Sequence, residues 1–211
     1  MRILIILSLA PVLSGCALIS NENLHHGVSY ASDHVAIAVR GQYRTVAVLP
    51  FFNATEYANA GRYARRSFFG ALAAYKNYSL QPMVETDARI KDLPRKALDP
   101  AEYQELARVL GTDLMVFGWV LRQMHSYGVL YGRNAVTVRI AFVDARTGRI
   151  VWESTDSRTR MLMGISLLSI FDNEYMWARE VCNRYDELFR DMMTALPDMS
   201  AVPNAPHTQL F

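Results

Sequence analysis

The run Thr-Val-Ala-Val-Leu at residues 45–49 restricts the fold more than any other feature of the sequence. Every position after the first is apolar, so the run has no polar side to turn toward water, and Pro50 ends it. A short β-branched run of this kind is typical of a strand that is buried on both faces. Such a strand requires a sheet covered by helices, so the sequence predicts an α/β protein.

Two segments have the periodicity of helices that could cover this sheet. Residues 98–111 carry boundary signals: Asp99 can accept hydrogen bonds from first-turn amides, Pro100 suits the first helical position, and Gly111 can end the helix. Residues 58–78 place apolar side chains three or four positions apart, which predicts a second amphipathic helix. Its apolar stripe is Tyr63, Ala64, Phe68, Ala71, Leu72 and Tyr75, and its solvated side is expected to carry Arg62, Arg65 and Arg66.

Three further strands are expected after residue 111. Residues 112–121 are almost entirely apolar, as in a central strand. Residues 135–144 alternate between large apolar and polar side chains, as in a strand with one face exposed. Residues 145–155 supply a turn and a return strand, in which Ile150 and Trp152 should pack beside the apolar face of the preceding strand.

The remaining segments complete the expected fold. Residues 79–86 predict a short strand, which Pro82 would place at an edge of the sheet. Residues 173–196 carry an apolar stripe that predicts a long C-terminal helix. Together the segments predict an α/β domain with a mixed sheet of about five strands, packed by helices, plus the long C-terminal helix.

The beginning of the chain has the layout of a secretory signal peptide. Arg2 precedes an apolar stretch that is too short to cross the ~30 Å hydrocarbon core of a bilayer as a helix. The small residues Ser14 and Gly15 then precede Cys16, as at a cleavage site. An ordinary cleaved signal peptide and a hydrophobic start to a buried helix are the alternative interpretations.

The sequence Leu-Ser-Gly-Cys at residues 13–16 resembles the lipobox of bacterial lipoproteins. The resemblance implies a signal peptide at residues 1–15 and lipidation of Cys16, which would hold the protein at a membrane. Ala17 follows the cysteine in place of the aspartate that favours inner-membrane retention in such proteins. The expected location is therefore the outer membrane of a Gram-negative cell, with the domain facing the periplasm or the cell surface.

The rest of the chain divides into three parts. Residues 16–41 are interpreted as the lipidated N-terminus and an irregular tether, residues 42–196 as a single domain, and residues 197–211 as a flexible tail. The net charge of +2 does not indicate a nucleic-acid partner. Only two cysteines are present, so lipidation of Cys16 would leave Cys182 without an intramolecular disulfide partner, and a small buried side chain is its expected role.

A wider resemblance covers about residues 43–155. The segments TVAVLPFFN, LARVLGTDLMVFGWV and VRIAFVDARTGRIVWES resemble lipoproteins built on the domain found at the N-terminus of TolB and in CsgG, in particular a branch that includes a neisserial surface antigen. The resemblance implies an envelope module without catalytic activity that binds other proteins or assembles into rings. In the secretion-pore branch, extra amphipathic hairpins enter the membrane, and the sequence indicates no pair of alternating strands of that length.

No catalytic or metal-binding motif stands out, and no cofactor is expected. Asp113 and Asp144 flank predicted strands, where a local hydrogen-bond acceptor is the simplest role for each. The histidines in residues 25–34 fit no spacing of a metal site. Residues 126–134 predict a recognition loop rich in glycine and tyrosine.

Two groups of residues are candidates for partner binding. The first is expected at the carboxyl end of the first strand and on the recognition loop; it comprises Phe51, Phe52, Asn53, Tyr127, Tyr131 and Arg133. An alternative role for Phe51 and Phe52 is core packing. The second lies in residues 161–171, which are too apolar for water and could pack in the core, against a subunit or against lipid; it comprises Ile165, Leu167, Leu168, Ile170 and Phe171.

These patterns favour a lipid-anchored envelope protein that acts through protein contacts, either with other envelope proteins or with further copies of itself, and catalyses no reaction. A pore component is one alternative. A periplasmic protein that binds or cleaves polysaccharide or peptidoglycan is another, and it would require a polar cluster such as Asp144 with His125 in one pocket.

Overall fold

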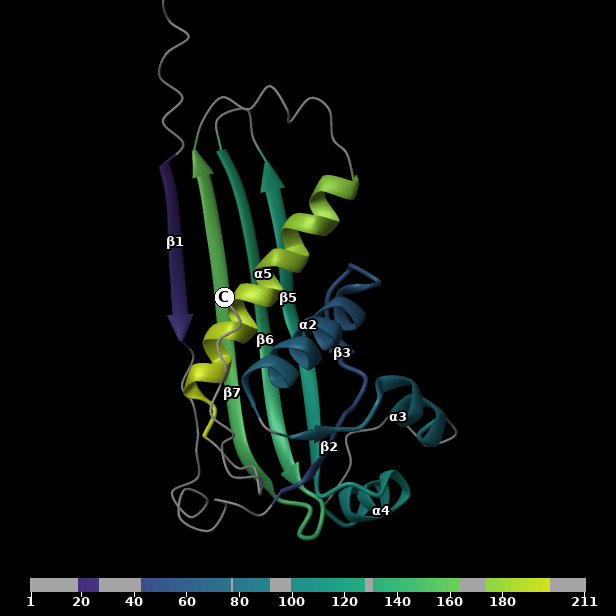
Figure 1. Cartoon of the computed structure of the whole chain (residues 1–211). Coiled ribbons are helices and arrows are strands. Elements are labelled where there is room, and N and C mark those ends of the chain that lie inside the picture. The colour runs from purple at the N-terminus through teal and green to yellow at the C-terminus, as the bar shows by residue number, and fades with distance from the viewer. Residues whose placement is uncertain are drawn as a thin grey trace, which may run out of the picture.

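The computed structural model describes residues 19–26, 43–76, 78–91, 100–127, 131–163 and 174–197 (Figure 1). These residues form seven strands and four helices, numbered as in Figure 1. The strands are β1 (Ile19–His26), β2 (Thr45–Val48), β3 (Phe52–Asn53), β4 (Ser79–Leu80), β5 (Leu114–Tyr127), β6 (Tyr131–Asp144) and β7 (Ile150–Met163). The helices are α2 (Ala60–Tyr75), α3 (Met83–Arg89), α4 (Pro100–Leu110) and α5 (Glu174–Ala195).

All seven strands belong to one mixed sheet in the order β1-β7-β6-β5-β2-β4, and the short β3 pairs with β5 beyond the end of β2. The strands β1, β7, β6 and β5 are antiparallel neighbours, whereas β2 pairs in parallel with both β5 and β4. Because β5, β6 and β7 each have 14 residues, the antiparallel part extends far beyond the short parallel part (Figure 1).

Helices cover both faces of the lower half of the sheet, as the buried run at residues 45–49 requires. We call the two faces the α5 face and the α4 face, after the longest helix on each. On the α5 face, α2 and α5 pack against alternate residues of β2, β5 and β6. On the α4 face, Leu106, Ala107 and Leu110 of α4 pack against Met115, Phe117 and Val143.

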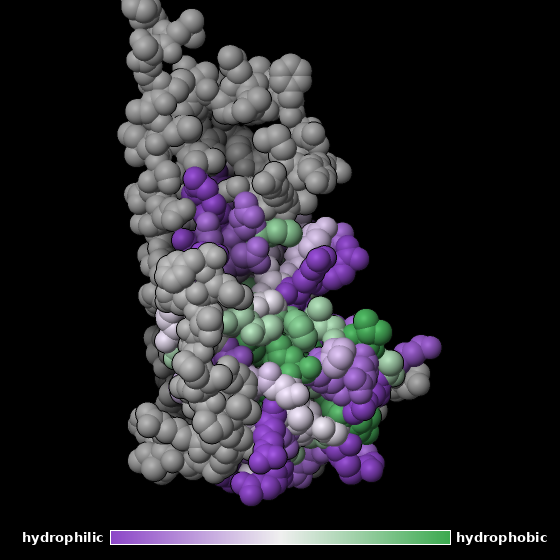
Figure 2. All heavy atoms as spheres, viewed as in Figure 1, coloured by the Kyte–Doolittle hydropathy of each residue, from purple (hydrophilic) through white to green (hydrophobic). Residues whose placement is uncertain are grey.

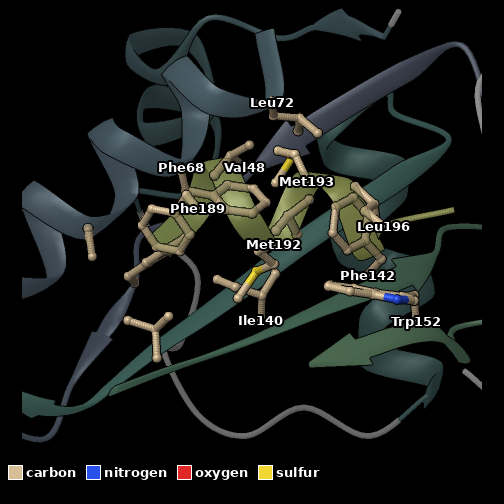
Figure 3. Close-up of a cluster of buried hydrophobic side chains, with 14 of the residues drawn as sticks. Val48, Phe68, Leu72, Ile140, Phe142, Trp152, Phe189, Met192, Met193 and Leu196 are labelled. Carbon is tan, nitrogen blue, oxygen red and sulfur yellow. The ribbon is translucent and has the colours of Figure 1, made fainter. Parts of the chain in front are cut away.

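The larger core lies between the sheet and the pair α2 and α5. In Figure 3, Phe68 and Phe189 point toward each other from the two helices, above Ile140 and Phe142 of β6. Their ring centroids are 5.2 Å apart in an edge-to-face arrangement, which the ring quadrupoles favour. Figure 2 shows the outer surface in the same view, where hydrophobic residues gather from α2 toward α3 and hydrophilic residues lie over the middle of α5.

The predicted α/β fold, with a mixed sheet and a long C-terminal helix, is confirmed, and α4 begins at the expected Pro100. Gly111 has φ +64°, as expected for a residue that ends a helix. The apolar face of β6 also agrees, because its residues from Val136 to Ile140 alternate between buried and more exposed. The sheet is larger than the five strands expected, and the expected absence of long strand pairs is wrong for β5, β6 and β7.

Three segment predictions are wrong in detail. Residues 19–26, expected in an irregular tether, form strand β1 against the edge of β7. In the predicted strand at residues 79–86, only Ser79–Leu80 is a strand, because Pro82 ends it and Met83–Arg89 is helix α3. Most of the predicted recognition loop at residues 126–134 is also strand, since β5 continues to Tyr127 and β6 starts at Tyr131.

Ile150 and Arg65 point the opposite way from the prediction. A register shift in β6–β7 pairs Val143 with Ile150 and Phe142 with Trp152, so Val151 is an extra residue, as in a β-bulge. Val151 and Trp152 are therefore both buried, and Ile150 is 43% exposed. Arg65, expected on the solvated side of α2, is also buried, because its guanidinium donates hydrogen bonds to the Val48 carbonyl oxygen and to the Asp87 carboxylate.

Candidate interaction surface

A row of side chains on the α4 face crosses β3, β5, β6 and β7 at the same level. Phe52 pairs with Trp119, Trp119 pairs with Arg139, and Arg139 pairs with Thr155 in the strand registers. Directly paired residues point to the same side of a sheet, so these side chains lie next to one another. Glu153, two residues before Thr155 on β7, forms an ion pair with Arg139. We call Phe52, Trp119, Arg139 and Glu153 the aromatic–arginine row.

The side chains of this row stack on one another. The Phe52 and Trp119 rings are 5.9 Å apart and nearly parallel, at 13°. The Arg139 guanidinium carbon lies 5.2 Å from the centre of the Trp119 ring, within the range of a cation–π contact. The ring contacts continue toward α4. The ring centroids of Trp119 and Phe117 are 6.3 Å apart, and those of Phe117 and Tyr103 are 5.0 Å apart.

The aromatic–arginine row marks the limit of what α4 covers. Phe117 is 6% exposed beneath α4, whereas Phe52 is 37% exposed and the Arg139 side chain 44% exposed. Trp119, between Phe52 and Arg139, is half-buried. Partial burial between α4 and the sheet raises the pKa of Tyr103, while the charge of Arg139 acts in the opposite direction. Tryptophan, phenylalanine and arginine are residue types that are enriched in protein interfaces. This row can therefore serve as a preorganised contact for another protein.

The first group of predicted site residues is divided between the core and the surface. Phe51 is 8% exposed and packs on Phe68, so it is a core residue, as the alternative interpretation held. Phe52 belongs to the aromatic–arginine row. Asn53 shapes the loop before α2, since its amide nitrogen donates to the Tyr57 carbonyl oxygen and its Oδ1 accepts hydrogen bonds from Thr55.

The structure does not bring Tyr127, Tyr131 and Arg133 to Phe52. Tyr127 ends β5 and Tyr131 begins β6, at the far end of the long strands. Trp119, the partner of Phe52, lies on β5 about 25 Å from Tyr127 at ~3.3 Å per residue. Arg133, which pairs with Ser126, is half-buried near this end. The binding roles of all three remain predictions.

Two other sets of predicted residues lie outside the described part of the chain. Cys16 precedes the first described residue, and residues 164–171, with Ile165, Leu167, Leu168, Ile170 and Phe171, follow the end of β7. The first three residues of the predicted apolar segment, 161–163, belong to β7 and pair with both β1 and β6.

Asp144 and His125 do not share a pocket, contrary to what an enzyme centred on them would require. Asp144 pairs with Leu114 at one end of the sheet, and His125 pairs with Asn134 near the other end. Asp144 instead lines a pocket of about 610 Å³ with Tyr43, Arg108 and Arg146.

The predicted acceptor role of Asp144 is confirmed, since it accepts hydrogen bonds from Thr147 in its own turn and also from the Tyr43 hydroxyl at 2.6 Å. Burial alone would raise the pKa of Asp144, but the hydrogen bonds from Tyr43 and Thr147 outweigh it and hold the pKa below its usual range. Asp113 is not a local acceptor; it accepts hydrogen bonds from Arg44 and Thr45, far away in the sequence.

A second pocket, of about 540 Å³, lies between α2 and α5 and is lined by Cys182, Ser67 and Asp186, among others. Burial and the nearby Asp186 raise the pKa of the Cys182 thiol. Within the described ranges, no group of three or more His, Cys, Asp and Glu side chains is placed to hold a metal ion. No helix in that part of the chain is both long enough and apolar enough to cross a membrane.

The sequence interpretation missed Trp119, Arg139 and Glu153. Residues 112–121 were treated as uniformly apolar, although Val116, Gly118 and Val120 face α2 and α5 while Phe117 and Trp119 face the other side. Glycine alternating with large aromatic residues was the available signal, because a strand with one small and one aromatic side packs differently on its two faces. Arg139 lies on the polar face that the alternation of residues 135–144 predicts.

The sequence matches no protein-family model and no curated protein. Among solved structures, the fold is similar to the PelC dodecamer from Paraburkholderia phytofirmans, with a TM-score of 0.50 and 20% identity over 85% of this chain and 99% of that chain. Lipoprotein GNA1162 from Neisseria meningitidis has a TM-score of 0.48 and 20% identity over 68% and 99% of the two chains. The LpoB C-terminal domain from Escherichia coli has a TM-score of 0.41 and 19% identity over 58% and 88%.

Proposed function

We propose that this protein is a lipid-anchored component of the bacterial envelope that acts by binding other proteins or further copies of itself through the aromatic–arginine row. The observation that carries the proposal is the mutually stacked set Phe52, Trp119 and Arg139 at the edge of the area covered by α4, in which Phe52 and Arg139 are exposed and Trp119 is half-buried. In this proposal the protein catalyses no reaction and needs no cofactor.

The lipobox-like sequence at Cys16 supports the envelope location, which we propose to be the outer membrane. The similar fold of a neisserial lipoprotein agrees with this location. PelC is a dodecamer, so self-association is one form that the protein contact could take. The row itself favours a protein contact, because stacking holds its side chains in place and lowers the entropy lost when a partner binds.

Photo-crosslinking in intact cells tests the proposal. A crosslinking amino acid at Phe52 should give a defined product, either with one envelope protein or at a multiple of this protein's own mass. The matched control is Val84 on α3, which is apolar and 83% exposed but lies outside the row. Equal products at both positions, or none at position 52, would contradict the proposed contact.

The variant Arg139→Glu provides a second test of the proposed contact. It removes the cation–π contact with Trp119 and places a negative charge beside Glu153, so the crosslink from position 52 should be lost. The control is Arg108→Glu, since Arg108 is a solvent-exposed arginine of α4 that forms an ion pair with Glu105 of the same helix. A crosslink that survives Arg139→Glu would show that the row is not the contact.

A further inference from the structure

The position of β1 determines which end of the domain lies nearest to Cys16. Residue Ile19, the first of β1, pairs with Met163, the last of β7. Three peptide units separate Cys16 from Ile19, and an extended chain covers at most ~3.6 Å per residue, or about 11 Å in all. An acyl group on Cys16 would therefore lie within about 11 Å of this end of the sheet, and no long tether would separate domain from membrane.

The same end of the sheet is where the longest strands finish. Met163 also pairs with Tyr131, the first residue of β6, and Tyr127, the last residue of β5, pairs with Gly132. Figure 1 shows β1 starting beside the ends of β5, β6 and β7, whereas α3 and α4 lie at the opposite end. We call this the β1 end of the sheet. The opposite end lies about 40 Å away, at ~3.3 Å per residue.

Two arginines near the β1 end carry positive charge that no described acidic side chain neutralises. Arg133 lies two residues from the first residue of β6, or about 7 Å along the strand, and Arg122 lies some 13 Å further along the sheet. Both point to the α4 face, because they alternate with residues that face α5. Arg122 is exposed, and the Nε of Arg133 is buried without a hydrogen-bond acceptor among the described residues.

On the other face of this part of the sheet, two arginines are paired with acidic side chains. Arg158 forms ion pairs with Glu187 and Asp191 of α5, and Arg184 pairs with Glu187. Arg122 and Arg133 thus supply positive charge on the face that no described helix covers in this part of the sheet. Arginine binds phosphate strongly through its planar guanidinium, and basic residues close to a membrane are attracted to anionic lipids.

We propose that the β1 end of the sheet rests on the membrane surface, with Arg133 contacting the phosphate groups of its lipids and Arg122, further along the strands, adding to the electrostatic attraction. This inference rests on the proposed lipidation of Cys16. It assigns an orientation in which the long strands stand away from the membrane and the aromatic–arginine row lies higher up, accessible to a partner.

Energy transfer on the acylated full chain tests the orientation. With Cys182→Ser as background, a donor dye is attached at Ser126→Cys near the β1 end or at Arg149→Cys in the β6–β7 turn, and an acceptor dye labels the vesicle surface. Transfer should be much stronger from position 126, because position 149 would lie about 40 Å further from the membrane. Equal transfer, or stronger transfer from position 149, would overturn the orientation.

Mass spectrometry of the same preparation separates the two proposals. An unmodified Cys16 would refute the proposed lipidation and with it this inference. An acylated Cys16 with transfer favouring position 149 would leave the lipidation intact and overturn only the inferred orientation.

The arginine contact has its own test. The full mature chain with Cys16→Ser is floated with vesicles containing phosphatidylglycerol. Binding should weaken about fivefold for Arg133→Gln, less for Arg122→Gln, which lies further from the surface, and most for the pair. The control Arg146→Gln with Arg149→Gln removes the same charge at the opposite end and should leave binding nearly unchanged. Equal weakening of binding by the Arg122/Arg133 pair and by the Arg146/Arg149 control pair, or no binding by the Cys16→Ser chain, would overturn the contact. Circular dichroism confirms that each variant is folded.

Discussion

At the scale of single residues, glycines decide how closely the elements approach. Gly118 of β5 lies directly beneath Phe51, and a Cβ built on it would stand 2.5 Å from two atoms of the Phe51 ring. Real Cβ atoms do not come so close to other atoms, so only glycine allows Phe51 to fill this part of the core. The alternation of glycine with Phe117 and Trp119 in β5 thus has a packing reason on each face.

We expect Gly118→Ala to lower the free energy of unfolding by about 2 kcal/mol, the usual cost of overpacking a core. Urea unfolding followed by circular dichroism measures this loss. Truncating the ring should relieve the clash, so Gly118→Ala should cost clearly less in a Phe51→Ala background. If the two substitutions are simply additive, the close approach of Gly118 and Phe51 is not what constrains this position.

At the scale of elements, helix ends and helix surfaces place opposite demands on glycine. Gly111 ends α4 with a positive φ, and a Cβ on it would also stand 3.3 Å from Nη1 of Arg89. Gly70 lies on the exposed side of α2, and a Cβ added to it would have no atom within 4 Å. The first glycine is required by the conformation that joins α4 to β5, while the second only weakens its helix.

The same substitution should therefore have opposite effects at these two positions. Gly111→Ala should destabilise the protein by about 1 kcal/mol, because an L-residue is strained in the left-handed conformation. Gly70→Ala should stabilise it by about 0.5–1 kcal/mol, since alanine favours a helix interior. Thermal unfolding of the two variants side by side measures both shifts, and a shift of the same sign in both would contradict this account.

At the scale of the whole molecule, the placement of β1 joins the beginning of the chain to its second half. The β1–β7 pairing sets Asn23 opposite Thr159, where Cα atoms of paired residues lie about 4.5–5.5 Å apart. This separation suits a disulfide. The orientation inferred for the membrane depends on this pairing, which makes the register the most informative point to test.

In a Cys182→Ser background, Asn23→Cys with Thr159→Cys should form an intramolecular disulfide on mild oxidation. The mismatched pair Asn23→Cys with Thr155→Cys should not, because four residues along β7 correspond to about 13 Å. Mass spectrometry of peptides from the oxidised, monomeric protein identifies the linkage. A disulfide in the mismatched pair, or in neither pair, would refute the register of β1.

Features that depend on local chemistry and short-range periodicity can be predicted from the sequence alone. The apolar run at residues 45–49, the boundary residues Pro100 and Gly111, and the alternation in residues 135–144 were sufficient for the α/β class and for several elements. The sequence also supplied the lipobox-like motif from which the membrane anchor is proposed. These features could be predicted because each is encoded by residues that are close together in the chain.

Only the tertiary structure decided which residues meet and which faces remain open. The aromatic–arginine row needs Phe52, Trp119 and Arg139 from three strands in one register, and no local pattern encodes that register. The burial of Arg65 depends on the Val48 carbonyl and on Asp87, which other elements supply. The strand β1 was missed because an edge strand needs only one hydrogen-bonded neighbour, and that neighbour, β7, lies more than a hundred residues away along the chain.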